Sequence, residues 1–475
     1  MSTTSRADMF GRRMITTDVE EITDENVLSV LEKALEIHEQ NRSEIQYLYD
    51  YYKGNQPVLG RTKEYRKEIN NKIVENRANE IVSFKVGYLM GEPVQYVNRG
   101  KDDISDELNL LNEYVFAESK STKDKELAEW FTIAGTSYRM VLPDSTEEPD
   151  EAPFEIYTLD PRDSFVVYYS GLGNKPMMAV KSVTKNDDTV VRSIYTKDKY
   201  YEVENDKIIK NEVHFLGRIP IIEYPANSAR LGAFEIVLPL LDAINEVASN
   251  RIDGIEQFIQ AIMLFKGIDI EAEDFKALKE EGGIQVPLEG DLKYLTQELN
   301  QTQTQTLVDY MYQTVLTICG MPNRNGGSST SDTGTAVIMR DGWTAAEARA
   351  KDTEMMFKQS EKEFLRLVID ITNTLRNTNL KLSSIEIRFT RRNYENIQEK
   401  AQVLISMLSN EKIHPRLAFE HSGMFVDPEL AYTQSMKYAE EKKKEAEKAL
   451  NAFSEKQVND EKAKINSTAE SEEDV

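Results

Sequence analysis

The chain contains very little cysteine, tryptophan and histidine, and it has no long apolar run. Its 475 residues include 1 cysteine, 2 tryptophans and 4 histidines. The single thiol of Cys319 cannot form an internal disulfide, so nothing in the sequence indicates an oxidising compartment. A membrane-spanning helix needs roughly 20 consecutive apolar residues, and no stretch approaches that length. Arg12 and Arg13 near the N-terminus are followed by no apolar segment, so we expect no signal peptide.

Positive charge is also in short supply. The chain carries 58 lysines and arginines against 82 aspartates and glutamates, and its net charge is -24 at pH 7. Affinity for nucleic acid comes largely from cations that neutralise phosphates, so this balance argues against a tight DNA binder. It does not exclude a protein that lies beside DNA without holding it. The length exceeds one ordinary hydrophobic core, so we expect two or more domains in a soluble protein that is cytoplasmic at synthesis.

Sequence patterns of catalysis and of cofactor binding are missing. No HExxH, Walker A, Rossmann or G-x-S-x-G pattern occurs. The histidines are scattered, and although His414 and His421 could share a metal, a pair without carboxylates or cysteines is usually structural. We therefore predict that the chain is not an enzyme. We assign it no catalytic residue, no cofactor-binding residue and no metal site.

Helical periodicity is the strongest positive signal, and it extends over residues 234–377. Apolar residues recur at steps of three and four, which predicts a helix over 234–267. Pro239 indicates that its regular part starts a few residues late. A second helix is predicted over 303–321, because Gly320-Met321-Pro322 is a typical helix stop. The packing stripe expected on the first helix consists of Leu241, Ile244, Ala248, Ile252, Ile255 and Ile259.

A polar stretch then joins the second helix to a very long one. Residues 322–335 are rich in glycine and serine and offer nothing with which to build a core. The long helix is expected from Ala336 to Asn377, with Gly342 as its weak point. At about 1.5 Å per residue such a helix would span roughly 60 Å, which is longer than a small domain is wide. A helix of this length is unusual in a globular protein, so we expect it to have a particular structural role.

The flanking regions show a mixture of helices and strands. We expect a flexible arm at 1–24, an α+β domain at 25–233, and a short strand-rich insert at 268–302. A further strand follows the long helix within 336–392, then a helical unit at 393–440 and a charged tail at 441–475, helical at first and then disordered. Alternating apolar residues predict strands at 138–142, 154–157, 165–169, 178–180, 190–195 and 200–203.

Several short motifs occur in a fixed order along the chain. They are Tyr51-Tyr52-Lys53-Gly54, Asn76-Arg77-Ala78, Val86-Gly87-Tyr88-Leu89-Met90-Gly91-Glu92-Pro93-Val94, Gly135-Thr136-Ser137-Tyr138, Asp160-Pro161-Arg162-Asp163 and Gly320-Met321-Pro322. Their succession resembles the portal proteins, or head-to-tail connectors, of tailed bacteriophages, in the branch common among phages of Gram-positive bacteria. No single motif is specific, but their order is.

The resemblance implies a mostly helical α+β portal architecture. In it, 25–233 is the wing, 234–267 and 303–321 are stem helices, 268–302 is the clip, 393–440 is the crown, and the long helix crosses the wing. The stretch 322–335 becomes a tunnel loop that projects into the channel. The residues assigned to this loop are Arg324, Asn325, Gly326, Gly327, Ser328, Ser329 and Asp332.

The resemblance also implies partners and a place in the virus. The expected assembly is a homo-oligomeric ring, a homododecamer, at one capsid vertex, and double-stranded DNA passes through it during packaging and ejection. The expected protein partners are the terminase large subunit, the major capsid and scaffolding proteins, and a head-completion adaptor, with no membrane. The protein would reside in the virion, and in the host cytoplasm during assembly.

Two other interpretations remain open. The first is a structural scaffold that uses the long helix as a coiled coil, although the helix lacks a sustained heptad pattern. The second is a cryptic metal-dependent nuclease, for which no motif speaks. The stripe on the 234–267 helix is, without the resemblance, more simply ordinary core packing, and the glycine-rich stretch is more simply a disordered loop.

Overall fold

The computed structural model describes residues 11–99, 105–144, 148, 151–259, 262–266, 290–295, 301–323, 342–390, 397–425 and 428–448. The chain divides into two compact units, Met1–Arg391 and Arg392–Val475. Both helices and strands contribute to the first unit, while the described part of the second is helical. The predicted α+β class is therefore confirmed.

The N-terminal part of the first unit contains the helices α1 (Val27–Tyr52), α2 (Arg77–Leu89), α3 (Ser105–Ala117) and α4 (Lys120–Ala134). The side chain of Asn76 caps α2 by accepting a hydrogen bond from the backbone N–H of Asn79. Gly135 ends α4 at a φ of +83°, and a Cβ there would lie 1.9 Å from the carbonyl oxygen of Arg230. This position therefore requires glycine.

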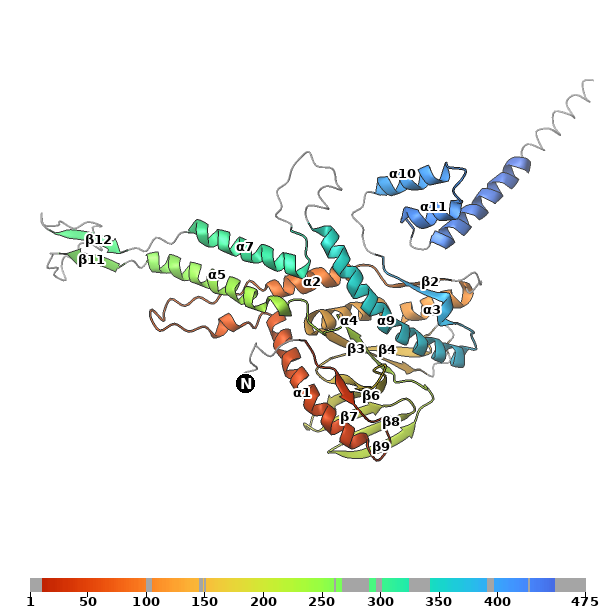
Figure 1. Cartoon of the computed structure of the whole chain (residues 1–475), viewed down its shortest axis with the longest axis horizontal. Coiled ribbons are helices and arrows are strands. Elements are labelled where there is room, and N and C mark those ends of the chain that lie inside the picture. The colour runs from red at the N-terminus through yellow and green to blue at the C-terminus, as the bar shows by residue number, and fades with distance from the viewer. Residues whose placement is uncertain are drawn as a thin grey trace, which may run out of the picture. The chain divides into compact units, whose positions relative to one another are not determined.

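A six-stranded sheet packs against α1 (Figure 1). Its strand order is β1-β5-β6-β7-β8-β9, and β1 pairs with β5 in parallel while the other neighbours are antiparallel. The strands are β1 (Ile15–Thr17), β5 (Ser164–Tyr169), β6 (Pro176–Thr184), β7 (Val190–Tyr195), β8 (Lys199–Glu204) and β9 (Lys207–Val213). The predicted strands within β5 to β8 are confirmed; β1 and β9 were not predicted.

A second, three-stranded sheet separates two hydrophobic cores. Its order is β10 (Ile221–Pro225), β3 (Thr136–Pro143) and β4 (Phe154–Leu159). Alternate side chains of β3 point to opposite faces, so Tyr138 and Met140 join the core beneath the six-stranded sheet while Val141 joins the larger core. The larger core also contains the apolar face of α9 (Trp343–Arg376), including Phe357, Phe364 and Val368.

The strand expected after the long helix is present. It is β13 (Ile385–Arg388), which pairs antiparallel with β2 (Gln95–Asn98). Because β2 lies between α2 and α3 in sequence, this pairing brings the chain after α9 back to an N-terminal part of the fold. Arg388 faces Gln95, and Ile385 faces Asn98.

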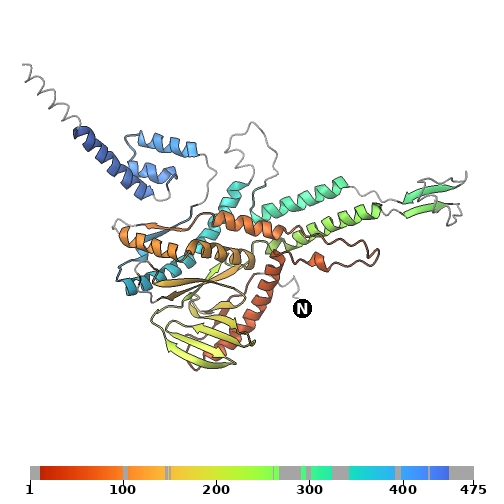
Figure 2. The same ribbon diagram turned by 180° about the vertical axis from the view of Figure 1, so that it is seen from behind.

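Two helices run side by side in both overall views, α5 (Leu238–Ile259) and α7 (Gln301–Cys319) (Figures 1 and 2). A short 3-10 turn, Glu235–Val237, leads into α5, so the predicted late start at Pro239 is confirmed. Beyond α5, strand β11 (Ile262–Lys266) pairs antiparallel with β12 (Asp291–Leu295), which precedes α7.

The second unit contains α10 (Ile397–Leu408), α11 (Pro415–Ser422) and a helix over residues 428–448. Phe419 of α11 stacks on Phe425 and contacts Tyr432 edge to face, with ring centroids 5.2 and 5.9 Å apart. The expected helices in this region, including the first part of the charged tail, are therefore present.

The structure corrects the N-terminal prediction. Residues 11–24 are not a flexible arm, because β1 adds to the edge of the six-stranded sheet and Arg12 is 4% exposed. The Arg12 guanidinium lies 3.1 Å from Glu44 and 2.6 Å from Glu235. Two carboxylates from distant parts of the chain thus hold this segment in place. Residues 1–10 of the predicted arm lie outside the described residues.

Two helix boundaries are also corrected. The 234–267 helix ends at Ile259, and residues 262–266 form β11, because a short apolar run fits a helix or a strand equally well until a pairing strand decides. The long helix begins at Trp343, not at Ala336, because Gly342 precedes it with a φ of +83°, which no right-handed helix accommodates. Residues 336–341 lie outside the described residues.

Candidate functional site

The pair formed by α5 and α7 has a covered half and an uncovered half. Near the start of α5, Phe234, Leu238 and Leu241 are buried in the larger core. Along α7, Val315 and Leu316 are buried in the same core. This part of the pair is therefore fixed by ordinary apolar packing within one copy of the chain.

Farther along α5, large apolar side chains are exposed. Ile252 is 39% exposed and Ile255 46% exposed, and on α7 Leu307 and Tyr310 are 48% and 68% exposed. Such residues are normal when they occur singly on a surface, but here they recur on two adjacent helices. The outer half of the pair therefore presents apolar surface to the surroundings of the chain.

The predicted packing stripe is thus divided between two environments. Leu241 and Ile244 are fully buried within the chain, and Ala248 is half-buried. Ile252 and Ile255 are exposed, and the side chain of Ile259 lies outside the described residues. The sequence pattern predicts the stripe on one helix, but it could not show where the chain's own covering of that stripe ends.

A second face of α5 is buried and polar. Asn245, Ser249 and Asp253 follow one another at intervals of four residues, and each is 2% exposed or less. Their side-chain oxygens accept hydrogen bonds from the backbone N–H groups of Glu75 (2.9 Å), Ile73 (3.0 Å) and Asn71 (2.8 Å), respectively. We call this set of three contacts the polar ladder. It attaches the 61–75 segment to α5.

Asp253 is the most strongly bonded member of the polar ladder. One carboxylate oxygen accepts from Asn71 Nδ2 at 2.9 Å as well as from its backbone, and the other lies 2.9 Å from Arg61 Nη1 and also contacts Lys63. Burial opposes ionisation, but the bonds from Lys63 and Asn71 outweigh it and lower the pKa of Asp253 to about 2. The side chain is therefore a carboxylate at neutral pH.

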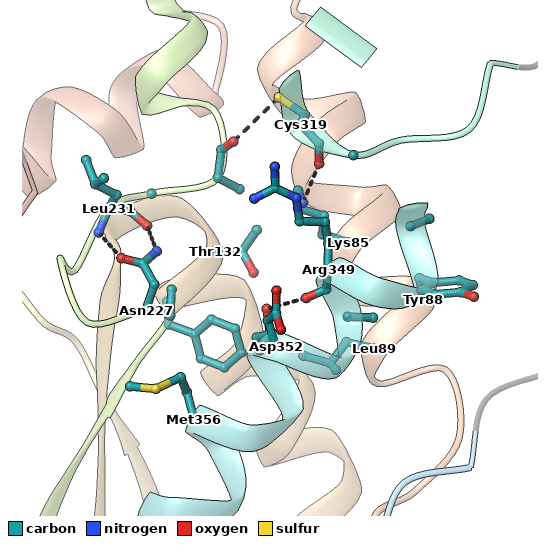
Figure 3. A pocket seen from close by; sticks show the side chains of 18 of the residues that line it. Lys85, Tyr88, Leu89, Thr132, Asn227, Leu231, Cys319, Arg349, Asp352 and Met356 are labelled. Atoms are coloured by element: carbon teal, nitrogen blue, oxygen red, sulfur yellow. Dashed lines mark hydrogen bonds between the residues drawn. The ribbon is translucent and has the colours of Figure 1, made fainter. Parts of the chain in front are cut away.

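A pocket of about 450 Å³ lies where α2, α7 and α9 meet the 226–236 segment (Figure 3). Lys85 of α2 donates a hydrogen bond to the carbonyl oxygen of Cys319 at 2.7 Å. Burial lowers the pKa of Lys85. The Cys319 thiol donates to the carbonyl oxygen of Ala233 at 3.6 Å, and burial raises its pKa to about 11. A thiol in that state is a poor nucleophile at neutral pH.

Close to this pocket, the two ends of the 324–341 segment meet. A Cβ built on Gly342 would lie 3.7 Å from both the carbonyl oxygen of Met321 and the Cα of Pro322. The end of α7 and the start of α9 are therefore adjacent. The residues predicted for a tunnel loop, Arg324, Asn325, Gly326, Gly327, Ser328, Ser329 and Asp332, lie outside the described residues.

A buried ionic cluster anchors α9 to the sheets. Glu361 of α9 lies 3.2 Å from Arg139 of β3 and 2.7 Å from Lys120 of α4. It also accepts hydrogen bonds from the hydroxyl groups of Tyr96 and Tyr224, at 2.5 and 2.7 Å. Asp124 contacts both cations. Two cations thus balance two carboxylates, which suits a structural role, since buried charges require partners.

Sequence reasoning missed the polar ladder and the Arg12 contacts. A signal for the ladder was present, because polar residues at positions 245, 249 and 253 form a second stripe at helical spacing within an apolar helix. No comparable signal marks Arg12, whose partners Glu44 and Glu235 are far away in sequence.

The described residues contain no group of three or more metal-ligating side chains that could hold an ion. Among the helices of the described ranges, none combines the length and apolar character that crossing a bilayer requires.

The comparison with curated proteins found no match. A model of a protein family does match, over residues 31–449, and its description is "Phage portal protein, SPP1 Gp6-like". The matched region begins within α1 and ends just after the helix over 428–448, so it includes both units. Because this model covers most of the chain, the chain belongs to the phage portal protein family.

Proposed function

We propose that about a dozen copies of the chain form a closed ring at one capsid vertex, with double-stranded DNA passing through its centre during packaging and ejection. The exposed apolar residues on the outer half of the α5–α7 pair carry this proposal. A single copy leaves Ile252, Ile255, Leu307 and Tyr310 in contact with water. Neighbouring copies in a ring would cover them, and burial of apolar surface would drive the assembly.

The parts of the chain take the following roles in this proposal. The α5–α7 pair is the stem, and the β11–β12 pair beyond it belongs to the clip, which the terminase large subunit and the head-completion adaptor contact. The two sheets with α1, α4 and α9 form the wing, and the second unit forms the crown. The segment between α7 and α9 serves as the tunnel loop, and its adjacent ends at Met321 and Gly342 suit a loop that leaves the wall and returns to it.

The charge of the chain suits conduction of DNA without capture. Each copy carries a net charge of -24. A predominantly acidic channel wall repels phosphates, so it avoids the release of counterions that makes DNA binding tight. Movement of DNA would then be driven by an ATP-dependent motor in another protein, and the ring would act as a passive channel. The capsid and scaffolding proteins would contact its periphery.

The test is assembly of the purified protein and of two variants. Ile255→Asp places a charge on the exposed stripe, and that charge would have to be desolvated when helices of neighbouring copies pack. Gln257→Asp is the matched control, because Gln257 is exposed two residues farther along the same helix. We expect rings with a central hole in negative-stain images of the wild type and of Gln257→Asp, and unassembled protein for Ile255→Asp.

Two results, one from light scattering and one from the images, would contradict parts of this proposal. A monodisperse wild-type monomer at micromolar concentration would contradict the ring itself. Normal rings from Ile255→Asp would leave the ring intact and show that the exposed stripe is not the contact between copies.

A further inference from the structure

The 61–75 segment lies along α5 at matched spacing (Figures 1 and 2). Four residues of an α-helix rise about 6.0 Å, and two residues of an extended chain rise about 6.6 Å. The acceptors on α5 therefore recur at nearly the same interval as every second backbone N–H of the segment. This explains why Asn71, Ile73 and Glu75 pair in turn with Asp253, Ser249 and Asn245.

Asp253 joins both limbs of the segment. Arg61 and Lys63 approach it from the first part of the segment, which we call the outgoing limb. Asn71 approaches it from the last part, the returning limb. Arg61 also lies 3.0 Å from Glu246 of the same helix. Removing the carboxylate would thus loosen both limbs at once.

The contact differs in kind from the packing of α5 on α7. Its hydrogen-bonding groups are polar and could be solvated by water after separation. Among the apolar residues of the segment, Ile69 is buried and Ile73 and Val74 are half-buried. The α5–α7 contact, in contrast, buries Val308, Met311 and Val315, whose exposure to water would be costly. The segment can therefore separate from α5 at a lower free-energy cost than α7 can.

We propose that the 61–75 segment is a releasable brace, fastened to α5 by Asn245, Ser249 and Asp253, which sets the direction in which the α5–α7 pair leaves the core. The segment begins just after the 3-10 turn at Pro57–Gly60 and ends at the cap of α2, so both of its ends are fixed in the first unit. With the brace attached, α5 is supported along the polar ladder. With the brace released, α5 loses the polar ladder and keeps its apolar packing and the hydrogen bonds of Asp242 to Tyr51 and of Arg251 to Gln305.

Hydrogen exchange of the backbone amides of Asn71, Ile73 and Glu75 tests the brace. We expect Asp253→Asn to raise their exchange rates at least about tenfold, because bonds to a charged group contribute more than neutral ones. Amides of α9 should exchange as in the wild type, because the core is untouched. Trypsin should also cut faster after Lys67, which is exposed in the segment.

Two further variants sharpen the test. Asp309→Asn makes the same chemical change at an exposed residue of α7 outside the ladder, and it should leave these rates unchanged. Ser249→Ala removes one acceptor without a charge and should affect mainly the amide of Ile73.

Three results would overturn the brace. Unchanged exchange at Asn71 in Asp253→Asn would show that the carboxylate does not fasten the segment. An equal rise in α9 would show that the ladder is part of the cooperative core and not releasable. An equal effect of Asp309→Asn would show that the loss of any carboxylate charge on the α5–α7 pair is enough to raise the exchange rates of these amides. None of these outcomes depends on whether the protein forms a ring.

Discussion

At the scale of single residues, two adjacent arginines near the N-terminus have different environments. The side chain of Arg12 is 1% exposed between Glu44 and Glu235, and that of Arg13 is 40% exposed beside Glu44 alone. Removing Arg12 takes this cation away from the buried carboxylate of Glu235 and leaves Glu44 with Arg13. We therefore expect Arg12→Ala to lower the free energy of unfolding by about 3–5 kcal/mol, as for other broken buried pairs.

Arg13→Ala provides the control for this prediction. Arg13 is 40% exposed, so water can solvate the site it leaves, and its loss should cost less than that of Arg12, about 1 kcal/mol. Urea unfolding of both variants measures the difference. Similar midpoints for the two variants would mean that water reaches the Arg12 site and solvates the carboxylates.

The same residues show what single-sequence reasoning can and cannot locate. Leu241 and Ile244 were predicted as packing residues because helical periodicity is a local signal, and both are buried. Asp253 and Arg12 were not identified, because a charged side chain is buried only when partners distant in sequence surround it. Arg61 and Asn71 lie more than 180 residues before Asp253, and no local pattern announces such an encounter.

At the scale of elements, the strands of the two sheets were predicted best where alternation was regular. β5, β7 and β8 alternate or carry continuous apolar residues between turn residues. β1 has three residues and is stabilised by pairing with the edge of β5. Its own sequence is therefore too short to indicate a strand. The sequence predicts residues 262–266 as the end of a helix for the related reason that β12, the partner of β11, begins 25 residues after β11 ends.

The segment between α7 and α9 allows a prediction at this scale. Its ends already meet at Met321 and Gly342, so removing Gly326 to Ser329 should leave both helices in place. Ring formation, seen by electron microscopy, should be unchanged. Packaged DNA in an assembly assay should fall, because the shortened segment reaches less far into the proposed channel.

Two different results would contradict this prediction for the deletion. Normal DNA packaging by the shortened protein would show that the segment is not a tunnel loop. Loss of rings would show instead that the segment contributes to contacts between copies.

At the scale of the whole molecule, the acidic charge opposes assembly. Every copy would bring a net charge of -24 to the proposed ring, so neighbouring copies would repel one another while the apolar stripe would attract them. Raising the salt concentration from about 0.01 M to 0.1 M shortens the screening length from roughly 30 to 10 Å. We expect the protein concentration at which half of the chains are assembled to fall over this range.

Sedimentation velocity at several protein and salt concentrations gives this midpoint. A midpoint that rises with salt would mean that ion pairs between copies, and not the apolar residues of α5 and α7, dominate the contact.

The burial of Cys319 has a practical consequence. It is the single cysteine of 475 residues, the residue is 3% exposed, and a pKa of about 11 leaves almost no thiolate at neutral pH. A cysteine introduced at an exposed position such as Gln257 is then the one site in the folded chain that reacts readily with a maleimide. Donor and acceptor fluorophores attached there would report, by energy transfer, when copies of the chain meet.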